Sequence, residues 1–309
     1  MKSQDLISIH DLPREEVFEI LDLAAMIKKT PDAYAKALEH QTLAMIFEKP
    51  SLRTRVSFET GMVQLGGHAI AIQGGEVGLG KREAIGDVAR TLAGMVNGIM
   101  ARTFSHQILI DLARFADVPV INGLSDHLHP CQALADFMTI RERLGKVEGI
   151  TLAWLGDGNN VLHSLMYAAA KLGAHVQAAT PEGYEPDAGV LSRARADAKA
   201  TGSRIEVGRD PAAAIKGADV VVTDTWASMG QESEHDARVK VFRPYQVNPS
   251  LMAKAKPGAI FMHCLPAHRG EEVTDDVMDS PVSVVFQEAA NRLHAQKAVL
   301  VLLLGQKKG

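Results

Sequence analysis

Residues 151–172 read TLAWLGDGNNVLHSLMYAAAKL, and this stretch decides the fold class. It opens with a short, mainly apolar run, which is typical of a buried strand. A turn rich in Gly and Asn follows, and Val161–Leu172 then predicts a helix. The next apolar run, His175–Thr180, completes a strand–helix–strand unit, which predicts two parallel strands in one sheet.

The same alternation of short apolar strands and longer amphipathic segments runs through the rest of the chain. It predicts an α/β protein with two domains, each a mainly parallel sheet flanked by helices. The length of 309 residues favours two domains as well, because single hydrophobic cores stop growing below that size. The expected junction is Gly145–Gly149, which gives domains at 1–145 and 146–287. The last segment, 288–304, is expected to be a helix that packs back on the first domain.

Parallel sheets bind ligands beyond the carboxyl ends of their strands. Strands are expected at 42–48, 68–73, 98–102, 118–122, 151–156, 175–180, 204–207, 220–224, 259–263 and 283–286. Further helices are expected at 14–29, 53–65, 84–95, 107–115 and 130–144. Polar motifs follow six of these strands, after Glu48, Arg102, Asn122, Gly156, Asp224 and His263. The sequence therefore predicts binding sites at the carboxyl edges of both sheets.

The composition is that of an ordinary soluble protein, with 46% hydrophobic and 23% charged residues. The net charge of -4 favours neither nucleic acid nor a membrane as a partner. Two cysteines, Cys131 and Cys264, make no disulfide framework and suit a reducing cytosol. The N-terminus lacks the features of a signal peptide, and the apolar run 298–304 is too short to span a bilayer. These features predict a cytoplasmic protein.

Ser51 directly precedes an amphipathic run, so it is expected to cap a helix. Arg53 and Arg55 then fall in the first turn, where exposed N–H groups disfavour cations. A bound phosphate would remove this conflict, because it accepts from N–H, hydroxyl and guanidinium donors together. For Arg55 an alternative stays open, namely an ion pair with Glu59 one turn later. No Gly-rich P-loop accompanies the cluster, which argues against a nucleotide.

Residues 47–55, FEKPSLRTR, resemble the carbamoyl-phosphate motif of the aspartate/ornithine carbamoyltransferases. The commonest form of that motif has Thr where this chain has Leu52, so only the backbone amide of Leu52 can contribute. The resemblance runs through almost the whole chain, with six motifs in the family's order. It implies that Ser51, Arg53 and Thr54 bind the phosphate of carbamoyl phosphate.

His129-Pro130-Cys131-Gln132 matches the family's His-Pro-x-Gln signature. Taken alone it is equally a capped helix with a buried histidine, since Pro suits the first position of a helix. The resemblance implies that His129 hydrogen-bonds the carbamoyl oxygen and that Gln132 holds the carbamoyl amide. Cys131 fills the variable position and is expected to pack in the core.

Two further arginines fit the same family pattern. Arg102 ends a predicted strand and is implied to contact the phosphate and the carbonyl, and Arg292 is implied to reach the carbamoyl oxygen. Related enzymes often supply a Gln from the loop before Lys81, where this chain has Gly78. Gln73 and Glu76 are the nearby candidates for that contact, and the choice stays open.

The turn GDGNNV at 156–161 could be mistaken for a dinucleotide-binding fingerprint. It lacks the third Gly, and the following strand ends in Thr180-Pro181 without a ribose-binding carboxylate, so NAD is not expected. The resemblance instead makes Asn160 a ligand for the amino-acid end of ornithine.

The segment DTWASMG at 224–230 looks like the Ser-Met-Gly loop of the ornithine-specific members. Asp224 is then expected to attract the ornithine ammonium group, and Ser228 and Met229 to close over the substrate. An alternative that is compatible with this role is a helix N-cap at Ser228 leading into 231–239. His263-Cys264-Leu265-Pro266 matches the family's His-Cys-Leu-Pro motif, which places the Cys264 thiol near the attacking amine.

The resemblance therefore implies transfer of the carbamoyl group of carbamoyl phosphate to the δ-amine of L-ornithine, giving L-citrulline and phosphate. The expected catalytic residues are Cys264, Asp224, His129 and Arg102. Carbamoyl phosphate is expected to bind at Ser51, Leu52, Arg53, Thr54, Arg102, His129, Pro130, Cys131, Gln132, Cys264, Leu265 and Arg292. Ornithine is expected to bind at Asn160, Asp224, Ser228 and Met229.

No metal or organic cofactor is expected, because no His or Cys pair has zinc-ligand spacing. The family also implies a homotrimer and a role in arginine biosynthesis. Two other functions stay open: a carbamoyltransferase for a different amine, and a non-catalytic binding module for small anions.

Overall fold

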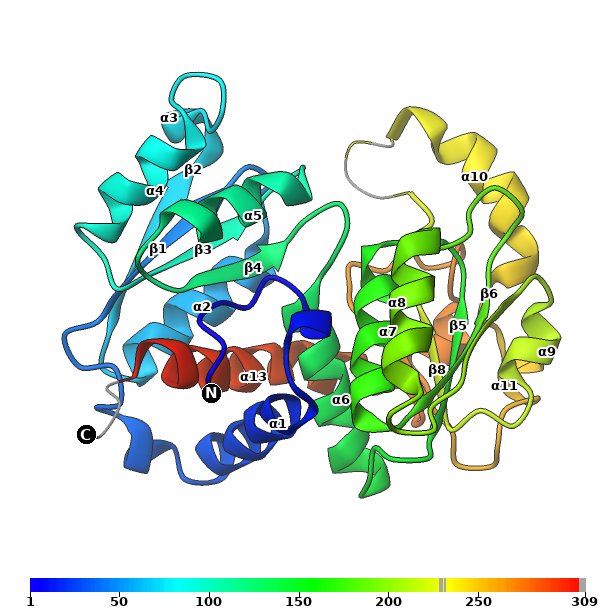
Figure 1. Cartoon of the computed structure of the whole chain (residues 1–309). Coiled ribbons are helices and arrows are strands. Elements are labelled where there is room, and N and C mark those ends of the chain that lie inside the picture. The colour runs from blue at the N-terminus through cyan, green and yellow to red at the C-terminus, as the bar shows by residue number, and fades with distance from the viewer. Residues whose placement is uncertain (228–229, 231, 306–309) are drawn as a thin grey trace. The chain divides into compact units, whose positions relative to one another are not determined.

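The computed structural model describes residues 1–227, 230 and 232–305. The chain forms two compact units (Figure 1). The first contains Met1–Met138 and the chain from Ala290 onward, and the second is Thr139–Ala289. Among the described residues, no helix is both long and apolar enough to cross a bilayer.

The first unit is built on a parallel sheet with the strand order β2-β1-β3-β4 in the described residues. Its strands are β1 (Thr42–Phe47), β2 (His68–Gln73), β3 (Gly98–Arg102) and β4 (Val120–Leu124). The flanking helices are α1 (Arg14–Lys29), α2 (Leu52–Gln64), α3 (Gly74–Val77), α4 (Ile85–Ala93), α5 (His106–Phe115), the start of α6 (Pro130–Leu144) and most of α13 (Val285–Leu304). Helices α4 and α5 lie on one face of the sheet, and α2 and α13 lie on the other (Figure 1).

The long helix α13 is part of the core of this first unit. Lys28 of α1 donates to Asn291 at 2.8 Å, and the buried Lys297 donates to Gln64 of α2 at 3.0 Å. Gly61 of α2 faces it so closely that an added Cβ would lie 3.3 Å from Lys297 Cγ and 3.7 Å from side-chain atoms of Leu293 and Leu300. A larger residue at Gly61 would therefore push the two helices apart.

The second unit is built on a parallel sheet with the order β7-β6-β5-β8-β9 in the residues described. Its strands are β5 (Thr151–Leu155), β6 (His175–Ala179), β7 (Ile205–Gly208), β8 (Val220–Thr223) and β9 (Ile260–His263). Its helices include α7 (Asn160–Leu172), α8 (Ala188–Ala198), α9 (Pro211–Ile215), α10 (His235–Phe242), α11 (Pro249–Met252) and α12 (Asp275–Met278). The predicted fold class, two domains with parallel sheets flanked by helices, is confirmed.

The order of strands reverses direction once in each sheet, and ligands of such folds bind at that reversal. In the first unit it lies between β1 and β3, and in the second between β5 and β8. Ser51 lies in the loop after β1 and Arg102 is the last residue of β3, while Asn160 begins the helix after β5 and Asp224 directly follows β8. The topology thus brings the expected site residues of each unit to one edge of its sheet.

One predicted strand is wrong. Ser283 makes only an isolated bridge to Phe261, and the predicted strand at 283–286 instead leads into helix α13, which begins at Val285. The β-branched run that suggested a strand is accommodated by the first turn of a helix, where Val285 is buried. The alternative of a helix over 231–239 capped by Ser228 is tested only in part, because 228, 229 and 231 lie outside the described residues; the described helix begins at His235, after a short 3-10 turn.

The two units divide inside α6 and α13 rather than in a loop. The domain boundaries at 145 and 287 remain a prediction, because a helix that continues from one unit into the other has no single boundary residue.

Candidate active site

The capping of α2 is the first element of the site. Ser51 is extended and caps the helix by accepting from the Thr54 amide at 3.3 Å. Its hydroxyl also donates to the buried Thr54 hydroxyl at 3.1 Å. The predicted N-cap is confirmed, and it places two hydroxyls beside the N–H groups of a helix start. Arg55 lies outside this cluster and pairs with Glu59 at 3.2 Å, as its alternative interpretation expected.

Arg292 of α13 joins this helix start to α6. Its Nη2 donates to Thr54 Oγ1 at 3.3 Å, and its Nη1 donates to Gln132 Oε1 at 2.7 Å. Arg292 is 2% exposed and Gln132 is 1% exposed, so these bonds are shielded from water. The structure therefore brings together Thr54, Gln132 and Arg292, which lie far apart in the sequence.

The charges of three guanidinium groups act on His129. Burial lowers the pKa of His129 well below its ordinary value, and the positive charges of Arg292, Arg102 and Arg53 lower it further. The imidazole is therefore neutral at physiological pH and can donate from one ring nitrogen without carrying charge. A small anion can be neutralised by the arginines while the histidine bonds a carbonyl oxygen.

The other predicted site residues of the first unit are exposed, buried in the core or engaged in local capping. Leu52 is 77% exposed, so its side chain is absent from the cluster and only its backbone can contribute. Cys131 is buried and donates to the Asn122 carbonyl at 3.5 Å, and burial raises its pKa to about 11. Gly78 ends α3 with φ 63°, and Gln73 and Glu76 hold each other in a capping box at the start of that helix. These two candidates for the missing Gln contact therefore have a local structural role.

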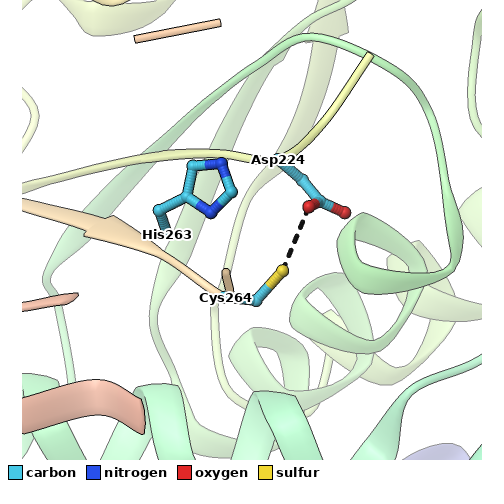
Figure 2. A group of neighbouring side chains, drawn as sticks. All are labelled: Asp224, His263 and Cys264. Carbon is cyan, nitrogen blue, oxygen red and sulfur yellow. Dashed lines mark hydrogen bonds between the residues drawn. The ribbon is translucent and has the colours of Figure 1, made fainter. Parts of the chain in front are cut away.

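In the second unit, Asp224 lies at the carboxyl edge of the sheet, beside His263 and Cys264 (Figure 2). It is 8% exposed and follows β8. The Cys264 thiol, at the end of β9, donates to Oδ1 at 3.1 Å, and the Thr225 amide donates to the same oxygen at 2.8 Å. Asn159 Nδ2 donates to Oδ2 at 2.8 Å. These three neutral donors fix the position of the Asp224 carboxylate, and a carboxylate suits a cationic ligand.

Asn159 is a residue that the sequence interpretation missed. Its side-chain oxygen caps α7 by accepting from the amides of Val161 and Leu162, while its nitrogen holds Asp224. The predicted ligand Asn160 is the first residue of the helix itself and is partly buried. An Asn directly before a helix is a recognised capping signal, and it could have identified Asn159.

Arg238 of α10 was also missed. It is 7% exposed, and its Nη1 contacts the Asp157 carboxylate at 3.3 Å and donates to the Trp226 carbonyl at 3.0 Å. Its Nε donates to Glu234 at 2.9 Å. Arg238 thus ties the turn after β5 to the loop after β8. Ser228 and Met229, which the sequence assigned to substrate closure, lie outside the described residues.

His263 holds the turn that carries Cys264. Its Nε2 faces Glu272 at 3.0 Å, and its Nδ1 accepts from the Leu265 amide at 2.8 Å. Although His263 lies close to Asp224 and Cys264 (Figure 2), both ring nitrogens are therefore engaged, and the imidazole is not available to a metal in this arrangement. Leu265 adopts φ 59°, which points to a tightly constrained turn.

Comparison with known proteins assigns both halves of the chain. Residues 4–142 match the carbamoyl-P binding domain of the aspartate/ornithine carbamoyltransferases, and residues 148–303 match their Asp/Orn binding domain. The chain belongs to this family. The family resemblance drawn from the motifs is thereby confirmed.

Relatives of this carbamoyltransferase are similar over their whole length. It is 56% identical to the ornithine carbamoyltransferase of Pyrococcus abyssi, over 100% of this chain and 98% of that protein. The solved structure of the ornithine carbamoyltransferase from Pyrococcus furiosus is 55% identical, with a TM-score of 0.96 over 99% of this chain and 98% of that one. The anabolic enzyme of Campylobacter jejuni is 37% identical, with a TM-score of 0.92 over 97% and 99% of the two chains.

Proposed function

We propose that this protein is an ornithine carbamoyltransferase, which transfers the carbamoyl group of carbamoyl phosphate to the δ-amine of L-ornithine and releases L-citrulline and phosphate. The observation that carries the choice of amine is the buried Asp224 carboxylate in the Asp/Orn binding domain. A fixed negative charge attracts the ammonium end of ornithine and repels the side chain of aspartate. The full-length relatives named ornithine carbamoyltransferase support the same choice.

The phosphate would bind at the start of α2. Ser51, Thr54 and the backbone of Leu52 offer hydroxyl and N–H donors there, and Arg53 and Arg102 supply the charge. Pro130 and Cys131 would contribute by position, since they build the helix start that carries His129. The assignment of Cys264 and Leu265, in the turn after β9, to carbamoyl phosphate stays a prediction from the family's motif.

The carbonyl carbon would be activated by His129, Arg292 and Thr54. The lone pair of the neutral δ-amine attacks this carbon, a C–N bond forms, and the carbonyl oxygen becomes an oxyanion. Fixed donors stabilise that charge without reorganising, which is commonly the largest catalytic effect. The C–O bond to phosphate then breaks, and the electron pair leaves with the phosphate.

Asp224 and Cys264 would orient the δ-amine, Asn160 would hold the amino-acid end of ornithine, and Ser228 and Met229 would close over the substrate. The amine must lose one proton during transfer. Asp224 or the departing phosphate can accept it, and Cys264 can do so only after its own thiol proton has passed to Asp224. A pH profile of kcat with Cys264→Ala distinguishes the Cys264 route from the other two.

One assay tests the proposed reaction. Carbamoyl phosphate and ornithine should yield equal amounts of citrulline and phosphate. If no citrulline forms with ornithine but a carbamoylated product forms with aspartate, putrescine or acetylornithine, the proposed amine substrate is wrong. Tight binding of carbamoyl phosphate without turnover of any amine would favour an anion-binding module.

Arg53→Ala tests the phosphate assignment. Loss of a charged hydrogen bond to phosphate should weaken carbamoyl-phosphate binding roughly tenfold to a hundredfold. The matched control is Arg209→Ala, which removes an exposed guanidinium that pairs with Glu182 and Glu185. Equal affinities of the two variants and the parent protein would contradict the assignment.

We further propose a homotrimer in the cytoplasm with a role in arginine biosynthesis. Three apolar side chains on one side of α2, Leu52, Val56 and Val63, are 77%, 51% and 66% exposed, which suits a protein interface. Three chains of 33.3 kDa give about 100 kDa in sedimentation. An active sample that sediments as a 33.3 kDa monomer would contradict the trimer. Growth of an arginine auxotroph that carries this protein tests the biosynthetic role.

A further inference from the structure

The side-chain amide of Gln132 is held from both ends. Its Nε2 donates to Asp136 Oδ1 at 2.8 Å, and its Oε1 accepts from Arg292 Nη1 at 2.7 Å. Turning the amide over would place its NH₂ group against the guanidinium and its oxygen against the carboxylate. Both contacts would become repulsive, so only one orientation of Gln132 is compatible with its neighbours.

Asp136, also in α6, is the residue that selects this orientation of the Gln132 amide. It lies one helical turn after Gln132 and is 1% exposed. An ionised carboxylate only accepts hydrogen bonds, so it selects the NH₂ end of the Gln132 amide. An asparagine at the same place would offer both an oxygen and an NH₂ group, and it would tolerate either orientation.

Arg292 is held on its other side by α2 and by its own helix. The Gln296 amide, in the orientation that satisfies its neighbours, accepts from Arg292 Nη2 at 2.9 Å and from Nε at 3.3 Å. Its nitrogen donates to Ser57 Oγ, and Thr54 accepts from Arg292 at 3.3 Å. The guanidinium is therefore fixed as well, and it keeps the Gln132 oxygen in place.

We propose that Asp136 is a positioning residue that determines specificity for a carbamoyl group. It fixes the Gln132 oxygen as an acceptor. The anion site at the start of α2 therefore prefers a ligand with an amino group on its carbonyl carbon. The inference rests on the proposed function, in which Gln132 contacts the carbamoyl amide. An amide oxygen accepts two hydrogen bonds, so Arg292 and the carbamoyl NH₂ can share it.

Acetyl phosphate is the probe that isolates this contact. It has the phosphate and carbonyl of carbamoyl phosphate, with a methyl group in place of the NH₂ group. When acetyl phosphate binds in the same place, its methyl group cannot donate a hydrogen bond to the buried Gln132 oxygen. A buried polar atom that loses a hydrogen-bond donor costs binding free energy, so the site should reject this analogue. Inorganic phosphate, the third probe, reports on the phosphate contacts alone.

The experiment measures the dissociation constants of the three probes for the parent protein and for Asp136→Asn. The parent should prefer carbamoyl phosphate to acetyl phosphate by roughly tenfold or more. Asp136→Asn should lose most of this preference, while its affinity for acetyl phosphate and inorganic phosphate stays within about twofold. Glu142→Gln is the matched control, a carboxylate-to-amide change at an exposed position of the same helix.

A double-mutant cycle with Gln132→Met shows whether Asp136 acts through Gln132. If it does, Asp136→Asn should change the preference no further once Gln132 is Met. An additional loss in the double variant, or an equal loss of affinity for all three probes in Asp136→Asn, would mean a general structural role and overturn the inference.

The outcomes also separate this inference from the proposed function. A parent protein without any preference for carbamoyl phosphate, or without citrulline formation, would contradict the proposed function itself. A parent with the preference and an Asp136→Asn variant that keeps it would overturn only the role of Asp136.

Discussion

Replacing Asp157 with asparagine should remove a pH-dependent loss of stability. Burial raises the pKa of Asp157 to about 6, the neighbouring Asp224 carboxylate adds to the rise, and Arg238 opposes it. The folded protein therefore binds this proton more tightly than the unfolded chain does. Because the folded pKa is the higher one, the stabilising effect is present at low pH and is lost as the pH rises through about 6.

The expected magnitude follows from the two pKa values. The ordinary value is 3.8 and the folded value is about 6, a difference of about two units. Each unit corresponds to about 1.4 kcal/mol, so ionised Asp157 lowers the free energy of unfolding by about 3 kcal/mol at neutral pH. Asp157→Asn has a similar shape and no such charge. Its stability relative to the parent should rise by about 2.5 kcal/mol between pH 4 and pH 7, because a small part of the effect is already lost at pH 4.

Urea unfolding at several pH values measures the effect in the second unit alone. Both tryptophans, Trp154 and Trp226, lie in that unit, so intrinsic tryptophan fluorescence follows its unfolding. Glu206→Gln, at an exposed position of β7, is the matched control and should show no such pH-dependent difference. A constant difference between Asp157→Asn and the parent from pH 4 to pH 7 would refute the raised pKa. A parent that gains stability over the variant as the pH rises would mean that the Arg238 ion pair outweighs burial.

Three further results are expected. Thr54→Val keeps the shape but removes the hydroxyl that Arg292 contacts, so the dissociation constant of carbamoyl phosphate should rise roughly tenfold to a hundredfold in calorimetry; an unchanged constant would contradict the role of that hydroxyl. Iodoacetamide at pH 8 should modify Cys264 and spare Cys131, whose pKa of about 11 and burial keep it a thiol, and peptide mass spectrometry would expose the reverse pattern. The His129 ring should stay neutral in NMR titrations from pH 8 to pH 5. Below pH 6.5 only the unfolded ring then gains a proton, so the folded state loses stability as the pH falls. A charged His129 ring in the folded protein at pH 6 would contradict the lowered pKa.

Much of the fold follows from patterns that are local in the sequence. The strand at Thr151–Leu155 and the helix after it have distinct periodicities and turn residues, so their positions were predicted within one residue. The strand at 283–286 was predicted wrongly because its local sequence pattern is ambiguous. Its short β-branched run fits a strand and a buried helix start equally well, and only the tertiary packing of α13 decides.

The site was predictable where a motif carries its own chemistry. The cap at Ser51 is readable because it serves a helix that begins at the next residue. Arg238 was missed because nothing near it in the sequence indicates that it meets Asp157, 81 residues away. Asp136 was missed for a related reason, since a helical acidic residue is usually solvated and its burial depends on the surrounding elements.

The contact between Arg292 and Thr54 joins residues that lie 238 positions apart in the chain. During synthesis, the segment from Met1 to Met138 leaves the ribosome long before α13 exists. Until then, the face of α2 that α13 covers has no partner, and the anion site lacks one of its arginines. The first unit to be translated is thus completed only after α13 has been made, and until then it exposes the surface of α2 that packs on α13.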